Sequence, residues 1–170
     1  VYLRLIDKTL ALGRQVLLLV PEINLTPQLE GRVRARFPAA GVVSLHSELA
    51  EAARERNWRA AFAGEASIVL GTRLAIFTPM PRLGLIVVDE EHDPSFKQQD
   101  GMRYSARDVA VFRARQLGIP ILLGSATPSL ESWANAQGRR YTLLSLRERA
   151  NPAAMLPAVN LLDTRKMTLK

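Results

Sequence analysis

The stretch Leu85-Ile86-Val87-Val88-Asp89-Glu90-Glu91-His92-Asp93 determines the fold that the sequence predicts. It begins with an uninterrupted apolar run, which is typical of a strand buried on both faces in a parallel α/β sheet. The run ends abruptly in four acids and a histidine. Because ligands of open α/β sheets bind outside the carboxyl ends of the strands, we expect these polar side chains to lie at a ligand site.

Asp89 and Glu90 are the candidates for chemistry in this stretch. An aspartate at the end of such a strand can hold Mg²⁺, directly or through water, and a neighbouring glutamate can orient and deprotonate an attacking water molecule. The alternative is a strand that runs into a solvated, acidic surface turn. Taken alone, the stretch leaves both interpretations open.

Two other apolar runs also end in polar residues. Ile121-Leu122-Leu123 leads into Gly124-Ser125-Ala126-Thr127-Pro128, whose hydroxyl groups can hydrogen-bond acids at the end of an adjacent strand. Val16-Leu17-Leu18-Leu19-Val20 leads into Pro21 and Glu22. Three strands that end in polar residues favour a nucleotide site over a surface turn.

The rest of the chain alternates helical and extended patterns, which predicts a parallel sheet with right-handed crossovers. The predicted strands lie near residues 15–20, 42–45, 67–70, 84–88 and 119–123, and the predicted helices near 1–12, 27–37, 50–63, 105–117 and 129–135. Tyr141–Leu146 and Ala158–Leu162 are further strand candidates, separated by a polar linker. Trp58 and Trp133 lie at helical positions, where we expect them to pack.

Six motifs follow one another along the chain. They are Leu19-Val20-Pro21-Glu22-Ile23-Asn24-Leu25-Thr26-Pro27-Gln28, Leu45-His46-Ser47, Gly71-Thr72-Arg73, Asp89-Glu90-Glu91-His92-Asp93, Arg103-Tyr104-Ser105-Ala106-Arg107-Asp108 and Gly124-Ser125-Ala126-Thr127-Pro128-Ser129-Leu130-Glu131-Ser132. This set resembles the DExH-type helicases of superfamily 2 and, among them, the PriA family of bacterial replication-restart helicases, also called primosomal protein N′. The resemblance covers roughly residues 1 to 165.

The resemblance implies a RecA-like P-loop NTPase fold, in which a mostly parallel sheet has helices on both faces. It also implies that the intact protein is an ATP-dependent 3′→5′ DNA helicase, which acts at stalled or abandoned forks and supports primosome assembly. Residues 1–146 would form the first helicase lobe, and residues 147–170 a linker and the start of the second lobe. Two alternatives are a non-catalytic DNA- or partner-binding relic of such a lobe, and another superfamily 2 translocase.

The resemblance also implies a role for each matching residue. Asp89 would hold the Mg²⁺ of MgATP and Glu90 would activate water, while His92, Ser125 and Thr127 would couple the state of the nucleotide to that of DNA. The implied DNA contacts are Pro21, Glu22, His46, Ser47, Thr72, Arg73, Arg103 and Tyr104. The alternative for His92 is a surface histidine beside acids, and Ser125 and Thr127 can also cap the helix that follows Pro128.

The segment Phe96–Tyr104 is too polar for a core strand and carries an aromatic residue at each end. It resembles the aromatic-rich loop that follows the acidic motif in the PriA family, where bases can stack on aromatic side chains. The alternative is a surface loop that Phe96 and Tyr104 hold against the protein. A different translocase would carry a different loop here.

No phosphate-binding loop of the form G-x-x-x-x-G-K-[ST] is present, because none of the lysines Lys8, Lys97, Lys166 and Lys170 follows a glycine. In the resembling family this loop lies immediately before the segment that matches Val1, and the chain lacks an initiator methionine. We therefore expect the sequence to begin inside a longer protein, one or two residues after the loop. Alone, the chain is predicted to be inactive as an ATPase.

The composition favours a polyanionic partner. The net charge is +7, the pI is about 10.5 and all but four of the 23 basic residues are arginine, which binds phosphate through a bidentate fork. The resemblance implies forked and single-stranded DNA, single-strand binding protein and other primosome proteins as partners, in the bacterial cytoplasm and at the nucleoid. The absence of cysteine excludes disulfides and thiolate metal sites, so the family's zinc is expected only in the second lobe of the full protein. No apolar run approaches the roughly 20 residues of a membrane span.

Overall fold

The computed structural model describes residues 1–146, apart from the side chain of Ile23, and divides the chain into the units Val1–Trp133 and Ala134–Lys170. The helices are α1 (Tyr2–Ala11), η1 (Glu22–Asn24), α2 (Pro27–Arg36), α3 (Glu51–Ala63), η2 (Arg73–Phe77), η3 (Pro94–Phe96), α4 (Ala106–Leu117) and α5 (Leu130–Gln137). The strands are β1 (Gln15–Leu19), β2 (Val42–Leu45), β3 (Ile68–Gly71), β4 (Leu83–Val88), β5 (Lys97–Gln98), β6 (Tyr104–Ser105) and β7 (Ile121–Leu123).

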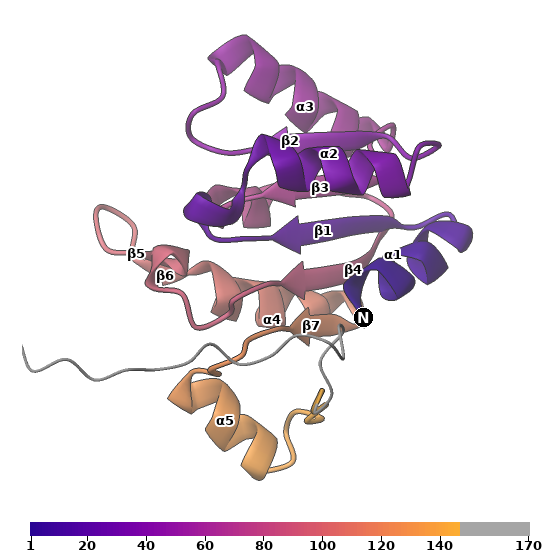
Figure 1. Ribbon diagram of the computed structural model, residues 1–170. Coiled ribbons are helices and arrows are strands. Elements are labelled where there is room, and N and C mark those ends of the chain that lie inside the picture. Colours follow the sequence, from indigo (N-terminus) through magenta and orange to yellow (C-terminus); the bar gives the residue numbers. More distant parts are fainter. Residues whose placement is uncertain (147–170) are drawn as a thin grey trace, which may run out of the picture. The chain divides into compact units, whose positions relative to one another are not determined.

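The first unit is built on a five-stranded sheet with the order β2-β3-β1-β4-β7 (Figure 1). Every neighbouring pair is parallel, and Leu19 at the end of the central strand β1 lies opposite Gly71 of β3 and Val88 of β4. The five carboxyl ends therefore share one edge of the sheet. The predicted mostly parallel α/β sheet is confirmed, and this edge is where its strands deliver the residues that follow them.

Helices cover both faces of the sheet, and the alternation along β1 shows why. Leu17 and Leu19 are fully buried in one apolar cluster, which includes residues of α3 and α4. Val16 and Leu18 belong to a second cluster, which includes residues of α1 and α2. Successive side chains of a strand point to opposite faces, so a continuous apolar strand needs helices on both sides.

The helix boundaries follow the capping residues in the sequence. Thr26 Oγ1 accepts a hydrogen bond from the Leu29 amide at 3.2 Å, and Pro27 occupies the first turn of α2. Ser105 Oγ accepts from the Asp108 amide at the start of α4. Gly118 ends α4 with a φ of 61°, a left-handed conformation that glycine adopts without a steric penalty.

The structure corrects three predictions. Tyr141–Leu146 is not a strand, and Leu143, Leu144 and Leu146 are exposed, because no strand pairs with this segment in the described residues. Trp58 and Trp133 do not pack into a core, because 43% and 47% of their surfaces are exposed. The strand predicted over 119–123 begins only at Ile121, since Pro120 before it has no N–H to give to a sheet.

The segment predicted as a polar loop contains a short hairpin, in which β5 and β6 pair antiparallel. The strand candidate Ala158–Leu162 and the linker at 147–170 lie outside the described residues. Among the helices that are described, none combines the length and apolarity needed to span a membrane.

Candidate functional site

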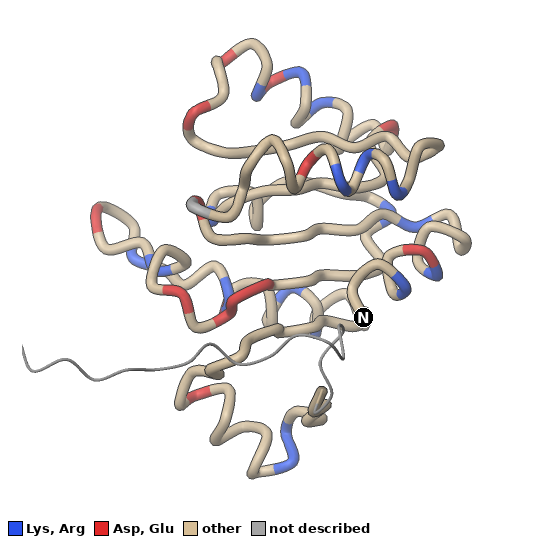
Figure 2. The backbone as a smooth tube through the Cα atoms, in the orientation of Figure 1, with Lys and Arg blue, Asp and Glu red and all other residues tan. Residues whose placement is uncertain are grey.

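Most of the predicted site residues follow the carboxyl ends of the parallel strands. Pro21 comes after β1, His46 after β2, Thr72 after β3, Asp89 after β4 and Ser125 after β7. Figure 2 shows a run of acidic residues at the end of β4. The sheet thus brings five segments that are far apart in the sequence to one edge, although the roles predicted for their residues remain predictions.

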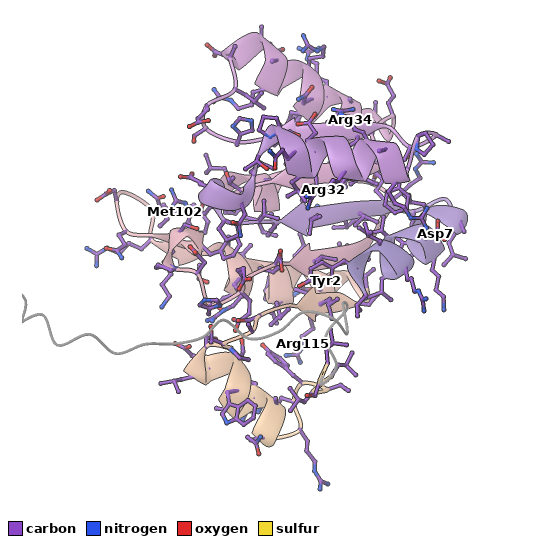
Figure 3. All side chains as sticks on the ribbon, in the orientation of Figure 1. Tyr2, Asp7, Arg32, Arg34, Met102 and Arg115 are labelled. Carbon is purple, nitrogen blue, oxygen red and sulfur yellow. The ribbon has the colours of Figure 1, made fainter. Side chains whose placement is uncertain are left out.

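Asp89 is fixed from two directions. Its backbone N–H donates to the Leu19 carbonyl at 2.9 Å, and its Oδ1 accepts a hydrogen bond from the Tyr2 hydroxyl at 2.8 Å. Tyr2 belongs to α1 and lies beside β4 in Figure 3. Burial raises the pKa of Tyr2 well above its ordinary value, and the hydrogen bond to Asp89 raises it further. The Tyr2 hydroxyl therefore stays protonated at neutral pH and donates to the carboxylate.

Glu90 occupies a left-handed backbone conformation, with a φ of 48°. This is uncommon for a residue other than glycine, and such conformations persist only where the surroundings enforce them. The Glu90 carbonyl accepts from the Asp93 amide at 2.8 Å, which closes the turn after β4. Its side chain is 40% exposed, and its Oε2 lies 3.6 Å from His92 Nδ1. This carboxylate is accessible to a water molecule at the strand end.

His92 contacts both predicted coupling hydroxyls. Its Nδ1 lies 2.7 Å from Ser125 Oγ and its Nε2 lies 3.4 Å from Thr127 Oγ1. Ser125 Oγ also accepts from the Thr127 amide, within the turn after β7. The N-terminal turn of α5 is instead capped by Ser129, whose Oγ accepts from the Ser132 amide at 3.2 Å. The alternative in which residues 125 and 127 cap this helix is therefore wrong.

The sequence indicates no chemistry for Glu91, yet it is the most buried acid of the motif, with 3% of its surface exposed. Burial alone raises its pKa, but hydrogen bonds from Ser129, Ser132 and Arg107 outweigh burial and hold the pKa below its usual range. The carboxylate is therefore ionised at neutral pH. Ser129, Ser132 and Arg107 each belong to one of the six sequence motifs. Their place in these motifs is the only sequence signal that they form a cluster with Glu91.

The residues predicted to contact DNA differ in their exposure. Glu22, Ser47 and Arg103 are exposed, and His46 is half-buried. Pro21 and Thr72 are buried, so their side chains do not line an open surface as expected. Thr72 joins the end of β3 to η2, and its backbone carbonyl accepts from the Ala75 amide.

Arg73, one of the predicted DNA contacts, binds the segment that resembles the aromatic-rich loop. Its Nη1 donates to the carbonyls of Ser95 at 2.9 Å and Lys97 at 3.3 Å. Tyr104 packs edge-on against Phe77 with 5.0 Å between ring centroids. Arg73 Nε and the Tyr104 hydroxyl are both buried without a hydrogen-bond partner in the described part of the chain. The segment is thus held against η2 by an arginine and an aromatic pair.

Phe96 belongs to the core, with 1% of its surface exposed. It cannot stack on a base in this structure. It holds the segment 96–104 against the protein, as in the alternative interpretation of this segment as a surface loop. Arg103 next to Tyr104 is exposed, and so is Met102 at the end of the hairpin, labelled in Figure 3. The solvent-facing part of this segment is therefore its turn rather than its aromatic ends.

The carboxylates fit one mode of magnesium binding. Within residues 1–146, no three histidine or acidic side chains are grouped closely enough to hold a metal ion by themselves. Mg²⁺ bound with a nucleotide needs only one or two carboxylates, since phosphate oxygens and water supply the other ligands. Asp89 at the end of β4 suits that arrangement. No residue of the chain supplies the backbone cradle and lysine of a phosphate loop.

The profile of DEAD/DEAH box helicases matches residues 1–136. The chain belongs to the DEAD/DEAH box helicase family. Together with the parallel sheet and the helices on its two faces, this membership confirms the predicted RecA-like fold. The helicase domain of Hef from Pyrococcus furiosus superposes with a TM-score of 0.49 at 10% identity, over 78% of this chain and 27% of that one.

Relatives of this helicase-family chain include replication restart proteins named PriA. The protein of Bacillus subtilis is 46% identical over 98% of the chain, and that of Haemophilus influenzae is 49% identical over 92%. The Synechocystis protein is 49% identical over 97%. These matches confirm the resemblance to PriA. The chain spans about a fifth of the length of these relatives, 20%, 21% and 20% respectively.

Proposed function

We propose that the chain forms part of the first motor lobe of an ATP-dependent 3′→5′ DNA helicase that restarts replication at stalled or abandoned forks. The observation that carries the proposal is the set of contacts at the ends of β4 and β7. Glu90 lies beside His92, and His92 lies within hydrogen-bonding distance of Ser125. These contacts link a carboxylate that can act on water to the Ser-Ala-Thr turn after β7. This turn would move when DNA binds.

Each residue of this edge contributes a distinct part of the hydrolysis. Bound MgATP would supply the phosphoryl group and the metal charge. Asp89 would hold the metal through its Oδ2, since the Tyr2 hydroxyl bonds to Oδ1. Glu90 would orient water and accept its proton. Positioned charge supplies most of the catalysis in phosphoryl transfer, so this turn needs rigidity more than reactivity.

The grip on the triphosphate would come from outside these 170 residues. The sequence holds no phosphate loop, and the PriA relatives are about five times as long. An arginine finger from a second lobe would complete the site, and such a finger increases turnover by about 10³–10⁵-fold. The intact protein, rather than this chain alone, is therefore the proposed enzyme.

DNA would bind along the same sheet edge. Arg103 and the exposed turn of the β5–β6 hairpin can meet the strand, and Arg73 ties that hairpin to η2. Phosphate contacts by arginine fix the register of a strand without reading its sequence. Movement of the hairpin would reach the acids through the six residues between Asp89 and Phe96. This is the proposed route between DNA and the nucleotide.

Phosphate release in steady state tests the proposal, with the natural protein that carries this chain and with the 170-residue chain alone. We expect the natural protein to hydrolyse ATP and single-stranded DNA to stimulate it. Glu90→Gln keeps the shape of the side chain but removes the base, and should lower turnover by about 10²–10⁴-fold. The 170-residue chain should show no turnover.

Two outcomes would contradict this function. If Glu90→Gln leaves the turnover of the natural protein unchanged, Glu90 is not the residue that activates water. A natural protein that binds DNA but never hydrolyses ATP would instead be the non-catalytic relative considered from the sequence. Asp93→Asn is the matched control, because Asp93 caps η3 through the Ser95 amide and has no proposed contact with the nucleotide.

A further inference from the structure

Glu91 departs from the box that gives its family its name. The letters of DEAD and DEAH place alanine third, whereas the chain reads Asp89-Glu90-Glu91-His92. Alanine has no polar group to bury, but the carboxylate of Glu91 is almost completely enclosed, with 1% of the side chain exposed. Acidic side chains are almost never fully buried unless they are paired, so this position requires a specific explanation.

Four hydrogen-bond donors surround the Glu91 carboxylate. Its Oε1 accepts from the Ser129 amide at 2.7 Å. Its Oε2 accepts from Ser129 Oγ at 3.0 Å, Ser132 Oγ at 2.9 Å and Arg107 Nη1 at 3.2 Å. A carboxylate accepts at both oxygens and donates at neither, whereas an amide would turn an NH₂ group toward at least one of these donors. The site therefore selects glutamate over glutamine.

Arg107 is the second charge of the cluster, and 8% of its side chain is exposed. It lies in the first turn of α4, where its Nε donates to Asp108 Oδ1 at 2.8 Å and its Nη1 donates to Ser129 Oγ at 2.7 Å. Three segments thus meet at one carboxylate, namely the turn after β4, the start of α4 after the hairpin, and the turn that begins α5. We call Glu91, Arg107, Ser129 and Ser132 the glutamate clamp.

The clamp holds the backbone on one side of the strained residue Glu90. The Asp89 amide donates to the Leu19 carbonyl and the Glu91 amide to the Gly124 carbonyl, both at 2.9 Å, so the residues before and after Glu90 are bonded to the end of β1 and to the residue after β7. The Glu91 side chain adds four hydrogen bonds to the backbone contact between the Glu91 amide and the Gly124 carbonyl. A left-handed φ at Glu90 is retained only if such anchors outweigh its strain.

We propose that Glu91 is a positioning residue, which acts through the clamp to hold Glu90 in its productive conformation and to make the hairpin, the acidic turn and the Ser-Ala-Thr turn move together. This rests on the proposed ATPase function of Glu90. A buried ion pair contributes little net stability compared with apolar side chains of the same volume, but its directional bonds fix geometry. Compared with an apolar core at the same place, the clamp therefore supplies fixed positions rather than additional stability.

The test uses the natural protein that carries this chain, with two measurements on each variant. Steady-state kinetics separates kcat from KM for ATP, and hydrogen exchange followed by mass spectrometry reports on the peptides that cover 103–108 and 129–133. For Glu91→Gln we expect kcat to fall at least about tenfold while KM for ATP stays within about twofold. Exchange should accelerate in both peptides together and stay unchanged in β2.

Two further variants keep the result interpretable. Glu131→Gln is the matched control, because the carboxylate of Glu131 is 62% exposed and lies 3.8 Å from Arg107 Nη1, and it should leave both measurements within about twofold of the wild type. Ser132→Ala removes one of the four donors with little risk to folding, and should lower kcat to a smaller extent than Glu91→Gln.

The proposal is overturned if Glu91→Gln keeps kcat within twofold, if it acts only on KM, or if the two peptides respond separately. If Glu91→Gln fails to fold, an unchanged kcat in Ser132→Ala overturns it instead. A wild-type protein without ATPase activity would refute the proposed function. The joint exchange response would then decide independently whether the clamp links its three segments.

Discussion

The Tyr2 hydroxyl donates a hydrogen bond of 2.8 Å to Asp89 Oδ1 across 87 residues of sequence. The bond ties α1 to the end of β4 and orients the carboxylate that is proposed to hold magnesium. Gly124, just after β7, is what makes room for it, because a Cβ at that position would overlap the Tyr2 hydroxyl. The glycine of the Gly-Ser-Ala-Thr motif is therefore required by a tyrosine from another part of the chain.

Gly124→Ala should destabilise the protein. The added methyl group must displace Tyr2, and overpacking of this kind costs about 1–3 kcal/mol. Gly31→Ala is the matched control, since a Cβ at Gly31 in the middle of α2 meets nothing within 4 Å and should raise the free energy of unfolding by about 0.5–1 kcal/mol. Urea unfolding of the 170-residue chain measures both. Equal stability of the wild type and Gly124→Ala would show that Tyr2 lies elsewhere.

His92 and Ser125 should act as one unit in the stimulation of ATP hydrolysis by DNA. Their side chains lie 2.7 Å apart, so removal of either one breaks the same contact. In the natural protein that carries this chain, His92→Ala and Ser125→Ala should each lower DNA-stimulated turnover by about tenfold and leave DNA-independent turnover nearly unchanged. The double variant should be no worse than the more impaired single variant. Additive losses would mean that the contact carries no coupling.

The glutamate clamp should weaken at low pH. The pKa of Glu91 is lower in the folded protein than in the unfolded chain, where glutamate titrates near pH 4.3. The stabilisation is therefore complete above the unfolded pKa and is lost as the pH falls through the folded value. The difference in free energy of unfolding between the wild type and Glu91→Gln should be constant above about pH 6 and shrink below about pH 4.

Chemical denaturation at a series of pH values measures this difference. The two proteins share all other carboxyl groups, so the contributions of those groups cancel in the difference. A gap that stays constant down to pH 3 would show that the carboxylate charge at Glu91 contributes no stability. Arg107 remains charged throughout this range, so a change in the gap reports on the acid alone.

Arg103 should contribute to DNA binding through phosphate contact. Replacement by alanine should weaken binding of single-stranded DNA to a similar extent for different sequences, and lower the slope of log affinity against log salt by about one. Fluorescence anisotropy over a salt series measures this. Arg59→Ala is the control, because the side chain of Arg59 is 73% exposed on α3 and paired with Glu55, away from the proposed site. An unchanged slope in Arg103→Ala would remove this contact.

The sheet and the positions of its strand ends were predictable because they depend on local patterns. Continuous apolar runs such as Leu85–Val88 are explained only by burial on both faces, and parallel strands place their carboxyl ends together. The capping residues Thr26 and Ser105 marked helix starts for the same local reason. The sequence alone is therefore enough to predict Asp89, Glu90 and Ser125 at one edge of the sheet.

The contacts that depend on tertiary packing could not be predicted. Nothing in the sequence distinguishes the buried Glu91 from the accessible Glu90, because burial of a charge depends on partners that lie 16 and 38 residues away. Trp58 is apolar and lies on a helix, yet it stacks on Phe62 on the outside of α3, with 5.7 Å between ring centroids. Its exposure is set by which face of the helix meets the sheet.

The strand order has a consequence for how the chain acquires its structure during synthesis. The central strand β1 is made before both of its neighbours, and β4 begins only at Leu83. At about 5–20 residues per second, a ribosome needs on the order of several seconds to reach β4 after completing β1. Until β3 is made, the five apolar residues Val16–Val20 have no neighbouring strand, and one edge of β1 stays unpaired until β4 follows. The nascent chain therefore carries an apolar strand with an unpaired edge for seconds, which leaves this strand open to non-native pairing during synthesis.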